Sequence, residues 1–141
     1  MPAECAQQIT GGGNVDGKAA KDNRVVFVTC GSQEEAQRIA SAVVDARLAA
    51  CANVLEAPVR STYRWKGQVE TTSEFLLLIK TVARLLPDLQ KEIARLHSYE
   101  LPEFIALPIV AGSRAYLDWL GANLRAATQR KAKPRRRKSG R

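Results

Sequence analysis

Residues 24–45 of this 141-residue chain read RVVFVTCGSQEEAQRIASAVVD and predict a β-strand followed directly by a helix. Arg24–Cys30 is a short, β-branched apolar run, which is typical of a strand buried on both faces. Ser32 and Glu35 then have the spacing of a capping box, with the serine as N-cap and the glutamate at the third helical position. The helix carries its apolar residues on one face: Ala36, Ile39, Ala40, Val43 and Val44.

The next part of the chain predicts a long β-hairpin. Cys51–Trp65 reads as a strand that Pro58 weakens, which indicates a bulge or an edge position there. Lys66 and Gly67 supply a tight turn, and Val69–Thr81 is the return strand. The hairpin is longer than a small four-stranded sheet needs, so its overhanging edges are expected to pair with other copies of the chain. We therefore predict a homo-oligomer.

A second helix and a fourth strand follow the hairpin. Pro87 falls in the first turn of the helix, where proline is tolerated because its missing N–H has no intrahelical partner. Phe104–Val110 predicts the strand, and Pro108 within it indicates an edge position. The apolar stripe of the helix consists of Leu89, Ile93 and Leu96.

A third helix is predicted at the end of the folded part of the chain. Ser113 can cap this helix, and leucines at positions 117, 120 and 124 have helical spacing. The order of elements is β-α-β-β-α-β with a C-terminal helix, which is the split βαβ, ferredoxin-like arrangement of an α+β domain. The helices are expected to cover one face of a four-stranded antiparallel sheet.

The charge of the chain is concentrated at its C-terminus. The net charge is +8, from 22 Lys and Arg against 14 Asp and Glu, and residues 128–141 contain eight of the basic residues and no acid. The rest of the chain is therefore neutral, which disfavours a basic nucleic-acid-binding fold. We predict a domain at residues 24–127 and a disordered basic tail at 128–141, which gives weak, salt-sensitive binding to polyanions.

The N-terminal part and the cysteines predict a cytoplasmic protein. Residues 1–23 read as a flexible leader without the apolar stretch of a secretory signal, and no segment approaches the length of a membrane span. Cys5, Cys30 and Cys51 are sparse and lack CxxC spacing, which is typical of reduced thiols in a reducing compartment. No membrane partner is expected.

Three functions that use this topology are disfavoured by the residues. An RNA-recognition module needs a strand rich in aromatics, whereas Ser73–Ile79 has one. A soft-metal chaperone needs two thiols at CxxC spacing, whereas Cys30 stands alone after the first strand. A hydrolase needs a nucleophile beside a base, and the chain has one histidine, His97, and no nucleophile elbow. We expect no enzymatic activity.

Four short segments resemble, in chain order, motifs of the CutA divalent-cation-tolerance family. In the last segment, Ser98 stands where the family usually has proline. The resemblance extends from about Val25 to about Leu124. The segments are Leu48–Val54 (LAACANV), Tyr63–Gly67 (YRWKG), Glu74–Thr81 (EFLLLIKT) and His97–Glu103 (HSYELPE).

The resemblance implies a homotrimer similar in architecture to PII signalling proteins, linked to divalent-cation tolerance. Some members have a proposed copper site made of a cysteine in the first strand and two adjacent histidines. At these positions the present chain has Val28, Leu96 and His97. We therefore expect a divalent cation such as copper to bind only weakly, through His97 with help from Glu100. Alternatively, His97 caps its helix as an imidazolium that favours the helix dipole.

Several residues are candidates for a cleft between subunits. The aromatics at the hairpin tip are expected to pack against a neighbouring subunit, since interfaces favour such side chains. Alternatively, the polar candidates form salt bridges and hydrogen bonds that hold the subunits together. The predicted function is a trimeric binding or regulatory protein of divalent-metal response, with an unidentified regulatory protein or small ligand as partner. The alternative is a PII-like sensor of a small anionic metabolite with no physiological metal. The cleft candidates are Tyr63, Trp65, Glu74, Lys80, Tyr99 and Glu100.

Overall fold

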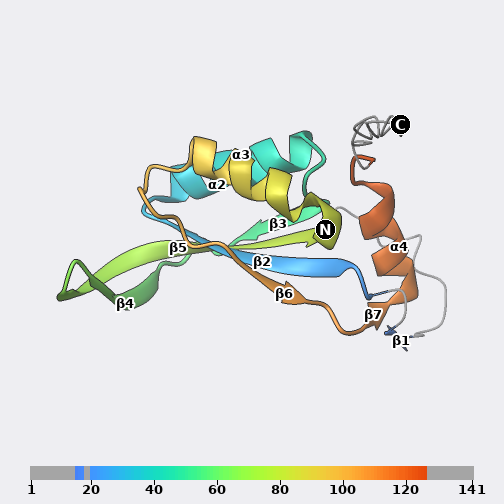
Figure 1. The fold of residues 1–141 in the computed structure, drawn as a ribbon, viewed down its shortest axis with the longest axis horizontal. Coiled ribbons are helices and arrows are strands. Elements are labelled where there is room, and N and C mark those ends of the chain that lie inside the picture. The colour runs from blue at the N-terminus through green and yellow to red at the C-terminus, as the bar shows by residue number, and fades with distance from the viewer. Residues whose placement is uncertain (1–14, 18–19, 127–141) are drawn as a thin grey trace, which may run out of the picture.

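The structure is a computed structural model that describes residues 15–17 and 20–126 (Figure 1). Its two longest helices lie side by side on one face of an antiparallel sheet, as Figure 1 shows. The elements in chain order are β1 (Val15–Asp16), β2 (Asn23–Cys30), α2 (Gln33–Asp45), β3 (Cys51–Val54), β4 (Val59–Trp65), β5 (Gln68–Val82), the 3-10 turn η1 (Ala83–Leu85), α3 (Leu86–Leu96), β6 (Ile105–Pro108), β7 (Gly112–Ser113) and α4 (Arg114–Ala122).

The main sheet has the strand order β3-β5-β2-β6, and β4 pairs with the first half of β5. All of these pairings are antiparallel. The predicted ferredoxin-like α+β fold with a C-terminal helix is thus confirmed. Among the strands of residues 15–17 and 20–126, β6 pairs only with β2, so the edge position that Pro108 indicated is also confirmed.

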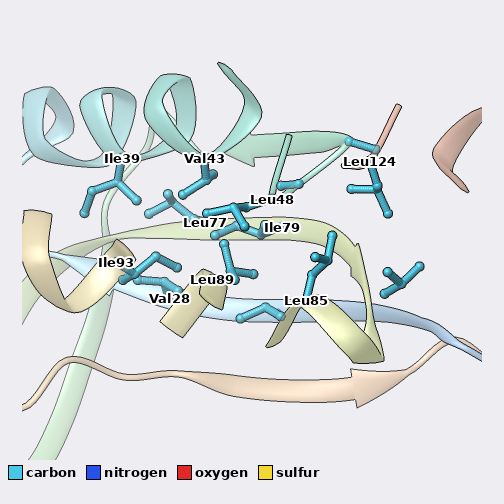
Figure 2. Close-up of a cluster of buried hydrophobic side chains, with 14 of the residues drawn as sticks. Val28, Ile39, Val43, Leu48, Leu77, Ile79, Leu85, Leu89, Ile93 and Leu124 are labelled. Atoms are coloured by element: carbon cyan, nitrogen blue, oxygen red, sulfur yellow. The ribbon is translucent and has the colours of Figure 1, made fainter. Parts of the chain in front are cut away.

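The core lies between the sheet and the two helices. Alternate residues of the central strands, such as Val28 and its cross-strand partner Leu77, point at the helices and are fully buried. Figure 2 shows them interleaved with Ile39 of α2 and with Leu89 and Ile93 of α3. Burying each such side chain contributes about 1.5–3 kcal/mol, so this layer supplies most of the stability that positions the loops.

The predicted long strand before the hairpin tip is two strands. β3 ends at Val54 and β4 begins at Val59, with Pro58 in the break between them. At the tip, Lys66 has φ 47° and Gly67 has φ 80°. A two-residue turn with both residues in the left-handed region matches the twist of the flanking strands. Figure 1 shows the resulting β4–β5 arm projecting beyond the helices.

The other face of the sheet is apolar and carries neither α2 nor α3. Ile105 of β6 is 49% exposed and Leu107 is 38% exposed. The alternation and register of the strands place half-buried apolar residues beside them. We call this surface the open face. Its apolar members are Val25, Phe27, Leu76, Leu78, Ile105 and Leu107.

Two predicted segments lie mostly outside the described residues. Within the predicted leader, Val15 and Asp16 form β1, which pairs with β7 near the start of α4, a pairing that was not predicted. The predicted basic tail, residues 128–141, falls outside the described part, so its predicted properties are untested. No helix within residues 15–17 and 20–126 is both long and apolar enough to cross a membrane.

Candidate functional site

The single histidine lies where α3 ends against the end of β2. His97 is the C-cap of α3, and its backbone N–H donates to the carbonyl of Ile93 at 2.9 Å. Its side chain is fully buried. The ring Nε2 lies 2.8 Å from the carbonyl oxygen of Thr29, and Nδ1 accepts from the backbone N–H of Tyr99 at 3.0 Å. A neutral ring with its proton on Nε2 satisfies both contacts, so the imidazolium cap is not the form that this geometry supports.

A buried carboxylate holds the residue after His97. Glu35 Oε1 accepts from the backbone N–H of Ser98 at 2.6 Å, and Oε2 accepts from its hydroxyl at 3.0 Å. The predicted capping box is therefore only half formed. Ser32 accepts from the N–H of Glu35 at 3.2 Å, but the Glu35 side chain turns away to Ser98. We call Cys30, Glu35, His97, Ser98 and Tyr99 the histidine cluster.

Tyr99 connects the histidine cluster to two of the other cleft candidates. Its ring centroid lies 4.8 Å from that of His97. Burial, and then the hydrogen bond and charge of Glu74, raise the pKa of Tyr99 to about 12, with a smaller contribution from Tyr63. Glu74 is buried. Glu103 adds a second acid, because burial and then the charge of Glu74 raise its pKa. The structure thus brings Tyr63, Glu74 and Tyr99 together.

The other three cleft candidates lie apart in the single chain. Lys80 and Glu74 are six residues apart on β5, which separates them by about 20 Å. Trp65 ends β4 at the tip of the arm, where the Lys66 ammonium lies 5.8 Å from its ring centroid. Glu100 is exposed in the loop after α3. It stays a prediction that another subunit brings these three residues next to Tyr63, Glu74 and Tyr99.

The polar residues of one chain do not fit a copper centre. No group of three or more His, Cys, Asp or Glu in the described residues could hold a metal ion. Cys30 Sγ lies 3.6 Å from Nε2 of His97, but burial, followed by the charges of Glu35 and Glu74, raises the pKa of this thiol to about 12. A thiol ligates metal as thiolate. Both ring nitrogens of His97 are also occupied, and Val28 is in the core.

A second polar group lies at the other end of β5. Lys80 and Cys51 are cross-strand partners, so their side chains share the open face. The Lys80 ammonium donates to Asn53 Oδ1, and the Cys51 thiol lies 3.9 Å from the same oxygen. Tyr116 of α4 joins them, because burial, and then the charge and hydrogen bond of Cys51, raise its pKa. We call Cys51, Asn53, Lys80 and Tyr116 the lysine cluster.

Sequence reasoning missed several members of these clusters. It assigned Glu35 only to the helix cap, and it did not select Asn53 or Tyr116 as candidates. Glu35 and Ser98 are 63 positions apart, so no local pattern connects them. The pairing of Cys51 with Lys80 depends on the register of β3 with β5, and that register is obscured by the break before β4.

The fold and these clusters define a small α+β, ferredoxin-like protein with a projecting hairpin arm. The pattern of the CutA1 divalent ion tolerance protein family matches residues 24–123. The chain is 48% identical over 99 residues to the divalent-cation tolerance protein CutA of Thermus thermophilus, covering 70% of this chain and 95% of that protein. It is 42% identical over 111 residues to mouse protein CutA, covering 79% of this chain and 60% of the mouse protein. The chain therefore belongs to the CutA1 family.

Solved structures agree with this assignment. The Thermus thermophilus divalent cation tolerance protein superposes with a TM-score of 0.70 at 46% identity, covering 72% of this chain and 98% of that one. A protein described as the periplasmic divalent cation tolerance protein CutA of Archaeoglobus fulgidus gives a TM-score of 0.69 at 34% identity, covering 72% and 97%.

Proposed function

We propose that this protein is a cytoplasmic homotrimer that binds a ligand or regulatory partner and contributes to tolerance of divalent metal ions such as copper. Membership of the CutA1 family supports the link to divalent ions. The proposal includes no catalytic activity. The thiol beside the imidazole, Cys30, is buried with a raised pKa, so this pair lacks an activated nucleophile.

The open face is the observation that carries the trimer. Monomeric proteins rarely expose a contiguous apolar patch unless it serves an interface. Leu107 and Ile105 are substantially exposed there, beside half-buried Val25 and Phe27 on the neighbouring strand. Each copy also has an arm that extends beyond its own helices (Figure 1), which suits pairing with the edge of another copy. Other copies of this chain are therefore the proposed occupants of this face.

Light scattering on the full-length protein tests the assembly. We expect a trimer for the wild type and dissociation for Leu107→Glu, because a carboxylate cannot be buried without a partner. Val44→Glu is a matched control, because Val44 is also 38% exposed but lies on α2. A wild-type monomer at micromolar concentration would refute the trimer. A Leu107→Glu protein that stayed trimeric would show that the open face is not the interface.

Metal tolerance is tested in the source organism and on the isolated protein. Deletion of the gene is expected to lower the copper concentration that cells tolerate, and the wild-type gene should restore it. In calorimetric titration under reducing conditions, copper should bind more weakly than about 1 µM, because a tight site needs several convergent donors. A stoichiometric submicromolar site that His97→Ala removes would contradict this expectation. In that case, metal binding would have to break both hydrogen bonds of the His97 ring.

A PII-like sensor of a small anionic metabolite is a second candidate function. One observation favours it. Lys80, a predicted cleft residue, has its ammonium on the open face with the neutral amide of Asn53 as its hydrogen-bond acceptor. Under this alternative, the protein responds to a metabolite and has no physiological metal.

A further inference from the structure

The segment before the main domain is attached to the start of α4. β1 pairs antiparallel with β7, with Val15 opposite Ser113 and Asp16 opposite Gly112. These four residues form a two-stranded sheet that is separate from the main sheet. Figure 1 shows β1 and β7 together beside the lower end of α4, away from the projecting arm. The family pattern matches residues 24–123, so β1 lies outside the matched domain.

Ser113 connects the two-stranded sheet to α4. It ends β7, and as the N-cap of α4 its hydroxyl accepts from the backbone N–H of Tyr116 at 3.3 Å. An N-cap satisfies a backbone N–H that the helix itself cannot pair. Because Ser113 is also the strand partner of Val15, displacement of β1 loosens the residue from which α4 begins.

β7 also packs against the buried side of α4. A Cβ at Gly112 would lie 3.1 Å from Leu117 Cδ2, so the Leu117 side chain lies against the backbone of this glycine. Leu117 itself is buried. Gly112 therefore has Asp16 beside it in the sheet and Leu117 over its face. β1 and α4 thus hold the same two-residue strand from two sides.

The residues that follow β1 keep it close to β7. A Cβ at Gly17 would lie 3.2 Å from the carbonyl oxygen of Val110. Ala20 is fully buried, and its carbonyl accepts from the backbone N–H of Asn23 at 2.9 Å. The Asn23 carbonyl in turn accepts from the N–H of Ile109 at 3.1 Å. Because this anchor is separate from the β1–β7 pairing, a released β1 stays near β7 and can rebind.

The far end of α4 is held independently of β1. The backbone N–H of Arg125 donates to the carbonyl of Arg47 at 2.9 Å, and its guanidinium donates to Asp88 at 2.6 Å. Leu120 and Leu124 are both buried in the core. The start of α4 is therefore the end that depends on β1, whereas its other end has anchors of its own.

We propose that β1 is a strap that holds the first turn of α4 against the domain, and that release of this strap frees the turn as a lid hinged at the other end of the helix. Tyr116 lies in this turn and its hydroxyl contacts Cys51 of β3, so movement of the lid also changes the lysine cluster. This conformational device goes beyond the proposed function and depends neither on a metal nor on the trimer.

Amide hydrogen exchange, followed by NMR on two truncated proteins, tests the proposal. Deletion of residues 1–14 keeps β1, whereas deletion of residues 1–17 removes it. We expect the amides of residues 116–120 to exchange about tenfold faster in the second protein. Local opening sets the exchange rate of such amides, and a tenfold change corresponds to about 1.4 kcal/mol. The amides of β2 and β5 should exchange alike in both proteins.

A point variant keeps the test decisive if the shorter protein does not fold. Gly17→Val retains the whole chain but places a branched side chain against the Val110 carbonyl, so it should displace β1 and accelerate the same amides. Gly13→Val makes the same change before β1 and should exchange like the wild type.

Two results would overturn the proposal. Equal exchange of the α4 amides in the two truncated proteins, or in the two point variants, would show that β1 does not hold the helix. Acceleration of β2 and β5 by the same factor as α4 would show that β1 stabilises the whole domain and that α4 is not a lid.

Discussion

The two ends of β5 carry two kinds of polar cluster. Near Glu74, the histidine cluster is closed: His97 uses both ring nitrogens on backbone groups, and Glu35 uses both carboxylate oxygens on Ser98. About 20 Å away, the lysine cluster is open, because the charge of Lys80 has no opposite charge nearby in the described residues. Buried groups with complete hydrogen bonds hold a loop in place, whereas an exposed polar group can exchange its partner with water. The two ring contacts of His97 therefore hold the loop after α3 against the end of β2.

The largest expected effect comes from breaking the closed cluster. Glu35→Ala removes the acceptor of two Ser98 hydrogen bonds and leaves a backbone N–H without a partner, so the free energy of unfolding should fall by about 3 kcal/mol. Urea unfolding at pH 7 measures this loss. Glu34→Ala, at the adjacent exposed position of α2, should change stability by less than about 0.5 kcal/mol. A loss below about 1 kcal/mol for Glu35→Ala would mean that the cluster does not hold the loop.

An intermediate effect is expected at alkaline pH. Burial raises the pKa of the Cys30 thiol from 9.0 to about 12, so the folded protein retains a proton that the unfolded chain releases. Its contribution to stability is therefore complete below pH 9 and is lost as the pH rises from 9 toward 12. The slope attributable to Cys30 approaches about 1.4 kcal/mol per pH unit at most. Urea unfolding between pH 7.5 and 10.5 should give a shallower decline for Cys30→Ala than for the wild type.

The wild type and Cys30→Ala should be compared by the slope of the free energy of unfolding against pH. Removal of the Cys30 sulfur also leaves a small cavity, which lowers stability at every pH. Parallel curves would show that the thiol ionises as easily in the folded protein as in the unfolded chain.

The smallest expected effect belongs to the open cluster. Asn53→Ala should lower the free energy of unfolding by less than about 1 kcal/mol, since Asn53 is exposed and water can replace its bond to Lys80. Thermal unfolding in phosphate-free buffer measures this change. A loss as large as that of Glu35→Ala would erase the contrast between the two clusters and show that the lysine cluster also has a structural role.

The fold was predictable because its signals are local. The apolar run that forms β2, the Ser32 cap of α2 and the proline in the first turn of α3 each depend on neighbouring residues, and each was confirmed. The arm was also predicted, since the turn at Lys66 and Gly67 has its own signature. A strand that continued from that turn without interruption would pair Cys51 with Val82, whereas its observed partner is Lys80.

The candidate site was less predictable because it depends on contacts between distant segments. Tyr63, Glu74 and Tyr99 were selected through the family resemblance, and the structure brings them together. The two bonds from Glu35 to Ser98 join α2 to the loop after α3, and no spacing rule connects those segments. Likewise, the environment of His97 is set by the backbone of β2, which the residue type does not reveal.

The break between β3 and β4 sets a rule for how this protein can change length. Across the break, Val54 pairs with Leu77 and Val59 pairs with Glu74, so the interrupted strand has two more residues than β5 opposite. The register of β4 against β5 is set by the two-residue turn at Lys66 and Gly67, so this connecting segment can change length without moving the arm. An insertion or deletion at positions 55–58 would be taken up by the break, and Tyr63 would keep its partner Glu70 and its face of the arm. Evolution or protein engineering can therefore vary this segment while preserving every surface of the arm.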